Sequence, residues 1–377
     1  MNWKIQLSEL NFDEQELAAV NEVLSSGWLS MGERCSAFER RFSEFVGIQE
    51  QSVFVSSATA GLHLALMALD VAEGDEVIIP GLTFVSDANV VVQLGAKPIL
   101  ADSVSLANFN ASVDDIVSKI TQKTRAIIIV HFAGFPMNLS QLIEICDEKN
   151  ITLIEDCAHA PGASVNGIHC GTMGHIGFFS FFANKNIATG EGGMVVSKDP
   201  VILEKVRNLR SHGMSTVTLD RHQGRATSYD VTDIGLNYRA DEIRAAIGLV
   251  QLEKVNEGNL KRKEIFSEYL RLTSDSPVEM PFSDLSSNKT ASYHIACAIL
   301  PPEANRNSII QKLKNKGIQT SIHYPNFKNF SAYKKFFRDS DLNVVDEISS
   351  RELTLPLHPN MTLEQAREVI SNLLEAL

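Results

Sequence analysis

The sequence has little positive charge for its length. Its 377 residues include 34 Lys and Arg against 46 Asp and Glu, which gives a net charge of −12. Surfaces that bind nucleic acid or an anionic membrane need clustered basic residues, so this composition argues against both kinds of partner. An anionic small molecule stays compatible with an acidic protein, because a few local Arg or Lys side chains can bind a diphosphate.

Long apolar runs and paired cysteines are also absent. No stretch approaches the roughly 18–20 apolar residues that span a bilayer, and the first nine residues contain no apolar signal-peptide core, which predicts a cytoplasmic protein. The cysteine count is odd and there is no CxxC pair, so we expect buried thiols and neither a disulfide framework nor a metal site. The cysteines are Cys35, Cys146, Cys157, Cys170 and Cys297.

What the sequence does contain is an alternation of short β-rich runs with helical stretches between residues 53 and 197. This order is typical of an α/β protein with a doubly wound, mainly parallel sheet. The predicted strands are 53–55, 76–79, 98–101, 125–130, 152–155, 176–180 and 193–197, and the predicted helices are 59–69, 84–94, 113–120 and 138–148. Ligands of such sheets bind beyond the carboxyl ends of the strands, where Ser57, Phe84, Asp156 and Lys185 all fall.

Further helices are predicted on both sides of this region. Residues 13–26 carry an apolar stripe of Leu17, Val20 and Leu24, and residues 36–46 carry phenylalanines at helical spacing. A long helix is expected over 241–270, and the last helix begins at Thr362 with a capping box. The composition changes after residue 274, so we predict a large domain over 1–274 and a smaller α+β domain over 275–377. The loop 215–229 is polar, with local positive charge from Arg221, His222 and Arg225.

Two stretches contain candidate catalytic residues. Residues 180–193 hold a single lysine, Lys185, between aromatic residues and a glycine-rich turn. Partial desolvation of such a lysine lowers its pKa and frees the amine to form a Schiff base. Upstream, residues 151–160 read as a buried strand that ends in an acid, Asp156. A lysine that holds an aldehyde and a carboxylate that keeps a pyridine nitrogen protonated are what a pyridoxal phosphate (PLP) enzyme needs.

Together these stretches resemble the DegT/DnrJ/EryC1/StrS family of sugar aminotransferases, which have the aspartate-aminotransferase (type I) fold of PLP-dependent transferases. The resemblance runs from about Gly27 to Pro359 and includes the segments 56–63, 80–86, 233–241, 322–325 and 355–359. It departs from the family in two places. Ala58 stands where glycine is common, and the run after Pro325 lacks the histidine that many relatives have.

The resemblance implies roles for individual residues. Lys185 and Asp156 would be catalytic, with PLP as cofactor and pyridoxamine phosphate (PMP) as its intermediate form. The other implied cofactor contacts are Ala58, Thr59 and Ser180 for the phosphate, Phe84 and His159 for the ring, and Asn237 of the neighbouring subunit in a homodimer with shared active sites. The implied substrate contacts are Trp28, His323 and Tyr324. From the residues alone, 56–63 could be a simple helix cap, 233–241 a capping loop and His159 a structural histidine.

The implied reaction is transfer of an amino group from L-glutamate to a keto-sugar, expected to be a nucleotide-linked 3- or 4-keto-(6-deoxy)hexose. Two alternatives stay open. One is a PLP/PMP-dependent sugar dehydratase, although such relatives typically carry histidine at the position of Lys185. The other is a non-catalytic regulatory protein with the same fold, since a fold does not determine a function.

Overall fold

The computed structural model describes residues 3–215, 228–337 and 340–377. Arg221, His222 and Arg225 of the predicted basic loop lie outside the described residues. Within the described ranges, no helix combines the length and the apolar composition needed to cross a bilayer. The five cysteines are all buried and unbridged, as predicted.

A seven-stranded sheet forms the centre of the molecule, with strand order β1-β11-β10-β7-β6-β2-β3. Neighbours from β10 through β3 pair in parallel, while β11 runs antiparallel to both β10 and β1. The strands are β1 (Val53–Val55), β2 (Glu76–Pro80), β3 (Lys97–Ala101), β6 (Thr124–Val130), β7 (Thr152–Asp156), β10 (Ile176–Ser180) and β11 (Gly193–Ser197). This confirms the mainly parallel α/β sheet and each of its predicted strands. Their β-branched runs are buried because helices cover both faces of a parallel sheet.

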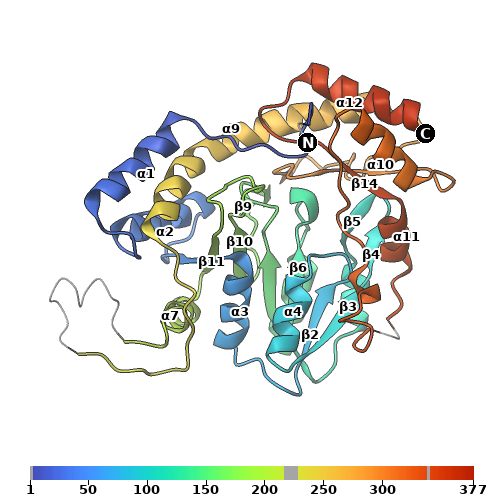
Figure 1. Cartoon of the computed structure of the whole chain (residues 1–377). Coiled ribbons are helices and arrows are strands. Elements are labelled where there is room, and N and C mark those ends of the chain that lie inside the picture. Colours follow the sequence, from blue (N-terminus) through green and yellow to red (C-terminus); the bar gives the residue numbers. More distant parts are fainter. Residues whose placement is uncertain (1–2, 216–227, 338–339) are drawn as a thin grey trace.

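Helices between the strands cover this sheet, and Figure 1 shows α3 and α4 on its near side. They are α3 (Ala58–Ala68), α4 (Ser86–Gln93), α5 (Val113–Ser118), α6 (Ser140–Lys149) and α7 (Pro200–Leu209). Side-chain caps begin several of them: Ser57 accepts from the Ala60 N–H, Ser112 from Asp115 and Asp199 from Val201. Such caps satisfy backbone donors that have no partner within the helix.

The C-terminal part is an α+β arrangement, in which β13 (Ala296–Ile299) pairs antiparallel with β14 (Glu352–Leu355). The capping box predicted at Thr362 is present at the start of α12. The other elements of this part are α10 (Arg306–Asn315), η2 (Phe327–Asn329), α11 (Asn343–Arg351) and α12 (Leu363–Ala376). Short elements missed from the sequence are β4 (Ser103–Ser105), β5 (Asn108–Ala111), β8 (Ser164–Val165), β9 (Ile168–His169), β12 (Lys289–Thr290) and η1 (Phe132–Gly134).

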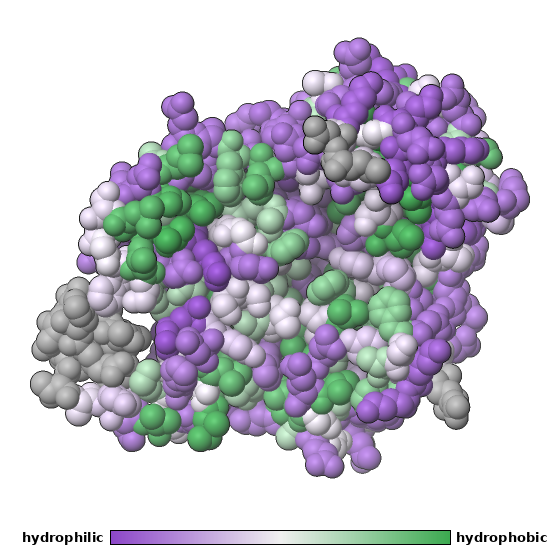
Figure 2. Space-filling view, viewed as in Figure 1, coloured by the Kyte–Doolittle hydropathy of each residue, from purple (hydrophilic) through white to green (hydrophobic). Residues whose placement is uncertain are grey.

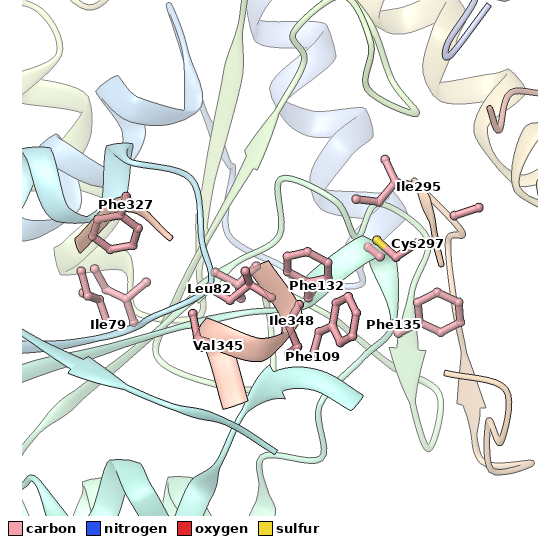
Figure 3. Close-up of a cluster of buried hydrophobic side chains, with 14 of the residues drawn as sticks. Ile79, Leu82, Phe109, Phe132, Phe135, Ile295, Cys297, Phe327, Val345 and Ile348 are labelled. Carbon is pink, nitrogen blue, oxygen red and sulfur yellow. The ribbon is translucent and has the colours of Figure 1, made fainter. Parts of the chain in front are cut away.

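One hydrophobic core joins the two predicted domains. Figure 3 shows Phe132 and Phe135, which follow β6, in the same cluster as Ile295, Cys297 and Ile348 from the C-terminal part. The first residues also cross the predicted boundary, because the backbone N–H groups of Lys4 and Ile5 donate to Gly317 O. The division at residue 274 stays a prediction. Its position coincides with the end of α9 (Glu242–Thr273).

Helix α9 crosses above the sheet from the N-terminal helices to α12 (Figure 1). Near its start, the Glu242 carboxylate accepts from the backbone N–H groups of Gly32, Arg34 and Cys35. These groups lie at the beginning of α2 (Glu33–Val46), whose N-cap residue has no side-chain hydrogen bond of its own. Further along, the Asn259 Nδ2 donates to Pro161 O at 2.9 Å. One rigid element therefore fixes segments that lie far apart in sequence.

Helix α1 (Glu14–Ser26) forms where predicted, but its apolar stripe faces outward. Leu17 is 67% exposed and Leu24 is 53% exposed, while Glu16 and Val23 are buried. Glu16 lies inward because its carboxylate accepts from Lys254 and Gln251 of α9. Figure 2 shows apolar side chains gathered over the region of α1. The spacing of the apolar residues predicted the helix correctly, and the structure shows that two of the three stripe residues face away from this chain's own core.

Candidate active site

A cavity of about 360 Å³ lies beyond the carboxyl ends of the parallel strands. Most of the predicted site residues line it, although they come from segments spread from α3 to the C-terminal part. Those that line it are Ala58, Thr59, Phe84, Asp156, His159, Ser180, Lys185, His323 and Tyr324. The loops that follow the parallel strands meet at this edge of the sheet, which brings most of these residues together. His323 and Tyr324 join them from the C-terminal part.

Lys185 follows β10 in a loop that ends with the glycine-rich turn. Burial of its amine lowers the pKa of Lys185 to about 8, and the nearby Asp156 carboxylate opposes this shift. Lys185 Nζ lies 3.5 Å from His294 Nε2. With this pKa, about a tenth of the amine is unprotonated at pH 7, far more than for an exposed lysine, and the unprotonated form is the one that attacks an aldehyde.

Asp156 ends β7 and is 5% exposed. Its Oδ1 accepts from the Ala158 N–H at 2.8 Å. Burial raises the pKa of Asp156 to about 6, opposed by that hydrogen bond and by the positive charge of Lys185. The carboxylate is thus ionised at neutral pH, and it would be stabilised further by a cation placed in the cavity.

The N-terminus of α3 forms one wall of the cavity, with Ala58 and Thr59 in its first turn. Backbone N–H groups at this position have no acceptor within the helix and suit an anion. The start of β11 packs against this turn: a Cβ on Gly193 would lie 2.6 Å from Ala58 N. Ser180, at the end of β10, also faces the cavity. The Ala58 substitution noted above removes no backbone donor, so the turn can still bind a phosphate.

Aromatic side chains line the opposite part of the cavity. Phe84 is 55% exposed, although the residue type alone suggests a core position, and its ring centroid lies 6.0 Å from that of Tyr324. The Ala133 N–H donates to His159 Nδ1 at 3.2 Å, so His159 carries its proton on Nε2 and donates to Tyr324 Oη at 3.2 Å. Burial lowers the pKa of His159 well below its usual value. Flat, uncharged groups therefore surround the space in front of Asp156.

Two predicted site residues do not line this cavity. Trp28 is half-buried and lies in the loop between α1 and α2, with its indole Nε1 directed at Met31 O at 3.5 Å. Asn237 is exposed and its backbone bridges to Ser211. That Asn237 reaches the active site of a neighbouring subunit stays a prediction.

Two further residues lie beside the site, and no sequence motif pointed to either of them. His294 lies 109 positions after Lys185, in a segment that reads as the approach to a buried strand. Asp87 lies in the first turn of α4, is fully buried and accepts from Thr83 Oγ1 at 2.6 Å. Burial, and then the charge of Asp156, raise the pKa of Asp87 well above its usual value. Only the folded chain shows that these side chains face the cavity residues.

The ligand atoms of His131, Glu155 and Cys157 lie within 4.8 Å of one another, in a buried cluster. The His131 Nδ1 accepts from the Met137 N–H, so its Nε2–H donates to Glu155 at 2.8 Å. Glu155 accepts in addition from the N–H groups of Gly171 and Gly174. Because the ligand atoms of His131 and Glu155 are already engaged, these two residues form a hydrogen-bonded clamp between β6, β7 and the 171–174 turn.

Comparison with known proteins gives a specific match. The profile of the DegT/DnrJ/EryC1/StrS aminotransferase family matches residues 11–374. The chain belongs to this family. A Saccharopolyspora spinosa relative, dTDP-4-dehydro-2,3,6-trideoxy-D-glucose 4-aminotransferase, is 35% identical over 369 residues, which cover 97% of this chain and 94% of the relative. The fold prediction and the prediction of an aminotransferase are thereby confirmed.

Solved structures of the family agree with this fold. The aminotransferase TlmJ of Streptoalloteichus hindustanus superposes with a TM-score of 0.91 at 33% identity, covering 99% of this chain and 98% of that one. PseC of Helicobacter pylori, an aminotransferase of pseudoaminic acid biosynthesis, also has a TM-score of 0.91, at 28% identity, with 99% and 98% of the two chains covered. A Streptococcus pneumoniae relative is known in PLP and PMP forms. The family is PLP-dependent.

The residues of this chain fit that cofactor. The buried Asp156 carboxylate, the Lys185 amine of lowered pKa and the anion-binding turn of α3 supply the three kinds of contact that PLP needs, at one cavity. Phe84 and His159 offer flat surfaces beside them. The roles of the individual residues stay predictions.

Proposed function

We propose that this protein is a PLP-dependent aminotransferase that moves an amino group from L-glutamate to a nucleotide-linked 3- or 4-keto-6-deoxyhexose. The observation that carries the proposal is the pairing of Lys185 and Asp156 across one cavity that also has an anion-binding helix N-terminus. The Saccharopolyspora relative, named as a 4-aminotransferase of a dTDP-linked 4-keto-sugar, favours the 4-keto position.

Different residues of the site would bind different parts of the cofactor. In this proposal, the N–H groups of Ala58 and Thr59 and the Ser180 hydroxyl hold the cofactor phosphate. Asp156 holds the pyridine nitrogen in its protonated form, and Phe84 and His159 confine the ring. When bound, PLP supplies an electron sink that stabilises negative charge on the substrate carbon. The buried Asp156 strengthens this effect because its charge acts in a site with little water.

Lys185 has two roles in this proposal. Its amine would hold the cofactor aldehyde, and once the amino donor has taken that place, the free Nζ would accept a proton from the substrate carbon and later give it back. A pKa of about 8 suits both directions of transfer. His323 and Tyr324 reach the cavity from the C-terminal part, where they would contact the sugar substrate.

We propose in addition that two copies of the chain share their active sites. The exposed leucines Leu17 and Leu24 supply an apolar surface that a second copy would cover. Trp28 and Asn237 lie outside the cavity of their own chain and would contribute to the partner's site. Mixing Lys185→Ala with Asn237→Ala subunits tests this. Activity in the mixture above that of either variant alone is expected, and a mixture as inactive as its parts would contradict the shared site.

The first experiment is an absorption spectrum of the purified protein with PLP, before and after addition of L-glutamate. We expect a visible band that L-glutamate converts to a near-ultraviolet band, with release of 2-oxoglutarate. Lys185→Ala is the control, and it should neither show the band of the lysine-bound cofactor nor turn over. A protein that stays colourless with PLP would favour the regulatory alternative. A band that L-glutamate leaves unchanged would mean a different amino donor or, with loss of a sugar hydroxyl, the dehydratase.

A further inference from the structure

His294 lies directly against the amine of Lys185. It precedes β13 and is 4% exposed, with Nε2 3.5 Å from Lys185 Nζ. Its ring centroid lies 4.5 Å from that of His159, at the edge of the cavity. The roles described so far use Lys185, Asp156 and His159, but none of them uses His294.

The hydrogen bonds around His294 fix its tautomer. Asn186 donates through Nδ2 to Ser292 O at 2.8 Å and to Asn259 Oδ1 at 2.7 Å. A backbone carbonyl can only accept, so the amide of Asn186 must turn its nitrogen toward Ser292 and its oxygen toward His294. That oxygen lies 2.9 Å from His294 Nδ1, which therefore carries the hydrogen. The lone pair of Nε2 is left facing Lys185.

The surroundings keep this imidazole neutral. Burial lowers the pKa of His294 well below its usual value, and the positive charges of Lys185 and Arg262 lower it further. Arg262, on α9, is 6% exposed and has no ion-pair partner within the part of the chain that the structure describes. A second cation next to these groups would be costly, because little water is present to screen it. His294 can therefore accept a hydrogen bond from Lys185 but is a poor acceptor for the proton itself.

We propose that His294 is a positioning residue whose neutral Nε2 accepts a hydrogen bond from Lys185 Nζ and stabilises the lysine ammonium without taking its proton. This role rests on the proposed function. When the Lys185 lone pair forms a bond to the proton of the substrate carbon, the carbon keeps the electron pair of the broken C–H bond. The proton then stays on Nζ, held by His294, and returns from there. No covalent bond to His294 forms.

The test uses the apo-protein and does not depend on turnover. Competitive acetylation resolved by peptide mass spectrometry gives the reactivity of Lys185 against pH, and hence its pKa. Loss of a neutral acceptor destabilises the ammonium more than the amine, so His294→Leu should lower the pKa of Lys185 by about one unit. His294→Gln, which keeps an acceptor near the position of Nε2, should stay within about 0.3 unit of wild type. Tyr293→Phe is the matched control and should cause no shift.

The loaded enzyme gives a second measurement. With L-glutamate and a keto-sugar acceptor, His294→Leu should lower kcat about 10- to 100-fold with KM changed less than about threefold, and His294→Gln should restore most of kcat. An unchanged pKa of Lys185 in His294→Leu would overturn the proposal. An equal fall in kcat in the His294→Leu and His294→Gln variants would overturn it too. If His294→Leu does not fold, His294→Asn replaces it in the test. The asparagine side chain is too short to reach Nζ, so the same fall in the pKa of Lys185 and in kcat is expected. A protein that shows the pKa shift but no glutamate reaction would disprove only the proposed function.

Discussion

Glu155 and Asp156 are neighbours at the end of β7, and strand geometry turns them to opposite faces of the sheet. The Glu155 oxygens accept from His131 and from the N–H groups of Gly171 and Gly174, in a fully buried clamp. Asp156 accepts one backbone N–H and faces the cavity. Two acids of the same strand thus differ in how completely the protein satisfies them. The satisfied one stabilises the fold, and the other is left available for a ligand.

The largest effect that tests this difference between Glu155 and Asp156 is expected for Asp156→Asn. This change removes the charge that would keep the pyridine nitrogen protonated, so turnover should fall at least about a hundredfold. Steady-state kinetics with L-glutamate and a keto-sugar acceptor would measure the loss, and chemical denaturation should show a fold no less stable than wild type. Activity within tenfold of wild type would remove Asp156 from the catalytic assignment.

Glu155→Gln should have the opposite effect, with a loss of stability and little loss of activity. One side-chain oxygen becomes an NH₂ group that faces existing donors, so the free energy of unfolding should fall by about 2–4 kcal/mol. Urea denaturation measures this loss, and the activity per folded molecule should stay within a few fold of wild type. Asp156→Asn serves as the control for the same denaturation series. If Glu155→Gln left stability unchanged but removed activity, the division of roles between the two acids would be wrong.

The stability of the apo-protein should depend on pH in a way that identifies the cavity pair. The folded pKa of Asp156 is raised from 3.8 to about 6, so its contribution to stability falls as pH rises through that window. The folded pKa of Lys185 is lowered from 10.5 to about 8, so stability rises again between about pH 8 and 10.5. The pair should therefore depress stability most between about pH 6 and 8, by about 1–3 kcal/mol.

The measurement is the urea midpoint against pH for wild type and for the double variant Asp156→Asn/Lys185→Met. The double variant should gain stability relative to wild type between about pH 6 and 8. Equal curves for the two proteins would mean that the cavity groups are solvated like surface residues.

The smallest effect is expected at the phosphate-binding turn. Ser180→Ala removes one hydroxyl donor and leaves the backbone donors of Ala58 and Thr59 in place, so PLP affinity should fall about tenfold. Titration of the apo-protein with PLP, followed by absorbance, gives the Kd. A fall of about a thousandfold would indicate that Ser180, and not the N-terminus of α3, provides most of the phosphate binding.

The sequence predicted the parts of this molecule whose signals are local. The β-branched runs, the helix caps and the lysine and acid motifs each lie within about ten residues, and the strands and the cavity around Lys185 and Asp156 followed from them. It did not predict which face of α1 packs, because the choice depends on Glu16 meeting Lys254 of α9. His294 was missed for the same reason, since its partner Asn186 lies 108 positions away.

Helix α9 constrains the number of residues between two of its contacts, as well as the residue types that make them. Glu242 holds the start of α2, and Asn259, on the same helix, holds Asn186 beside the active-site lysine. Each helical residue adds about 1.5 Å and 100° of rotation. A single insertion or deletion between these two positions would therefore turn Asn259 away from Asn186, however conservative the inserted residue. Along this span, the count of residues should matter more than the identity of most of them.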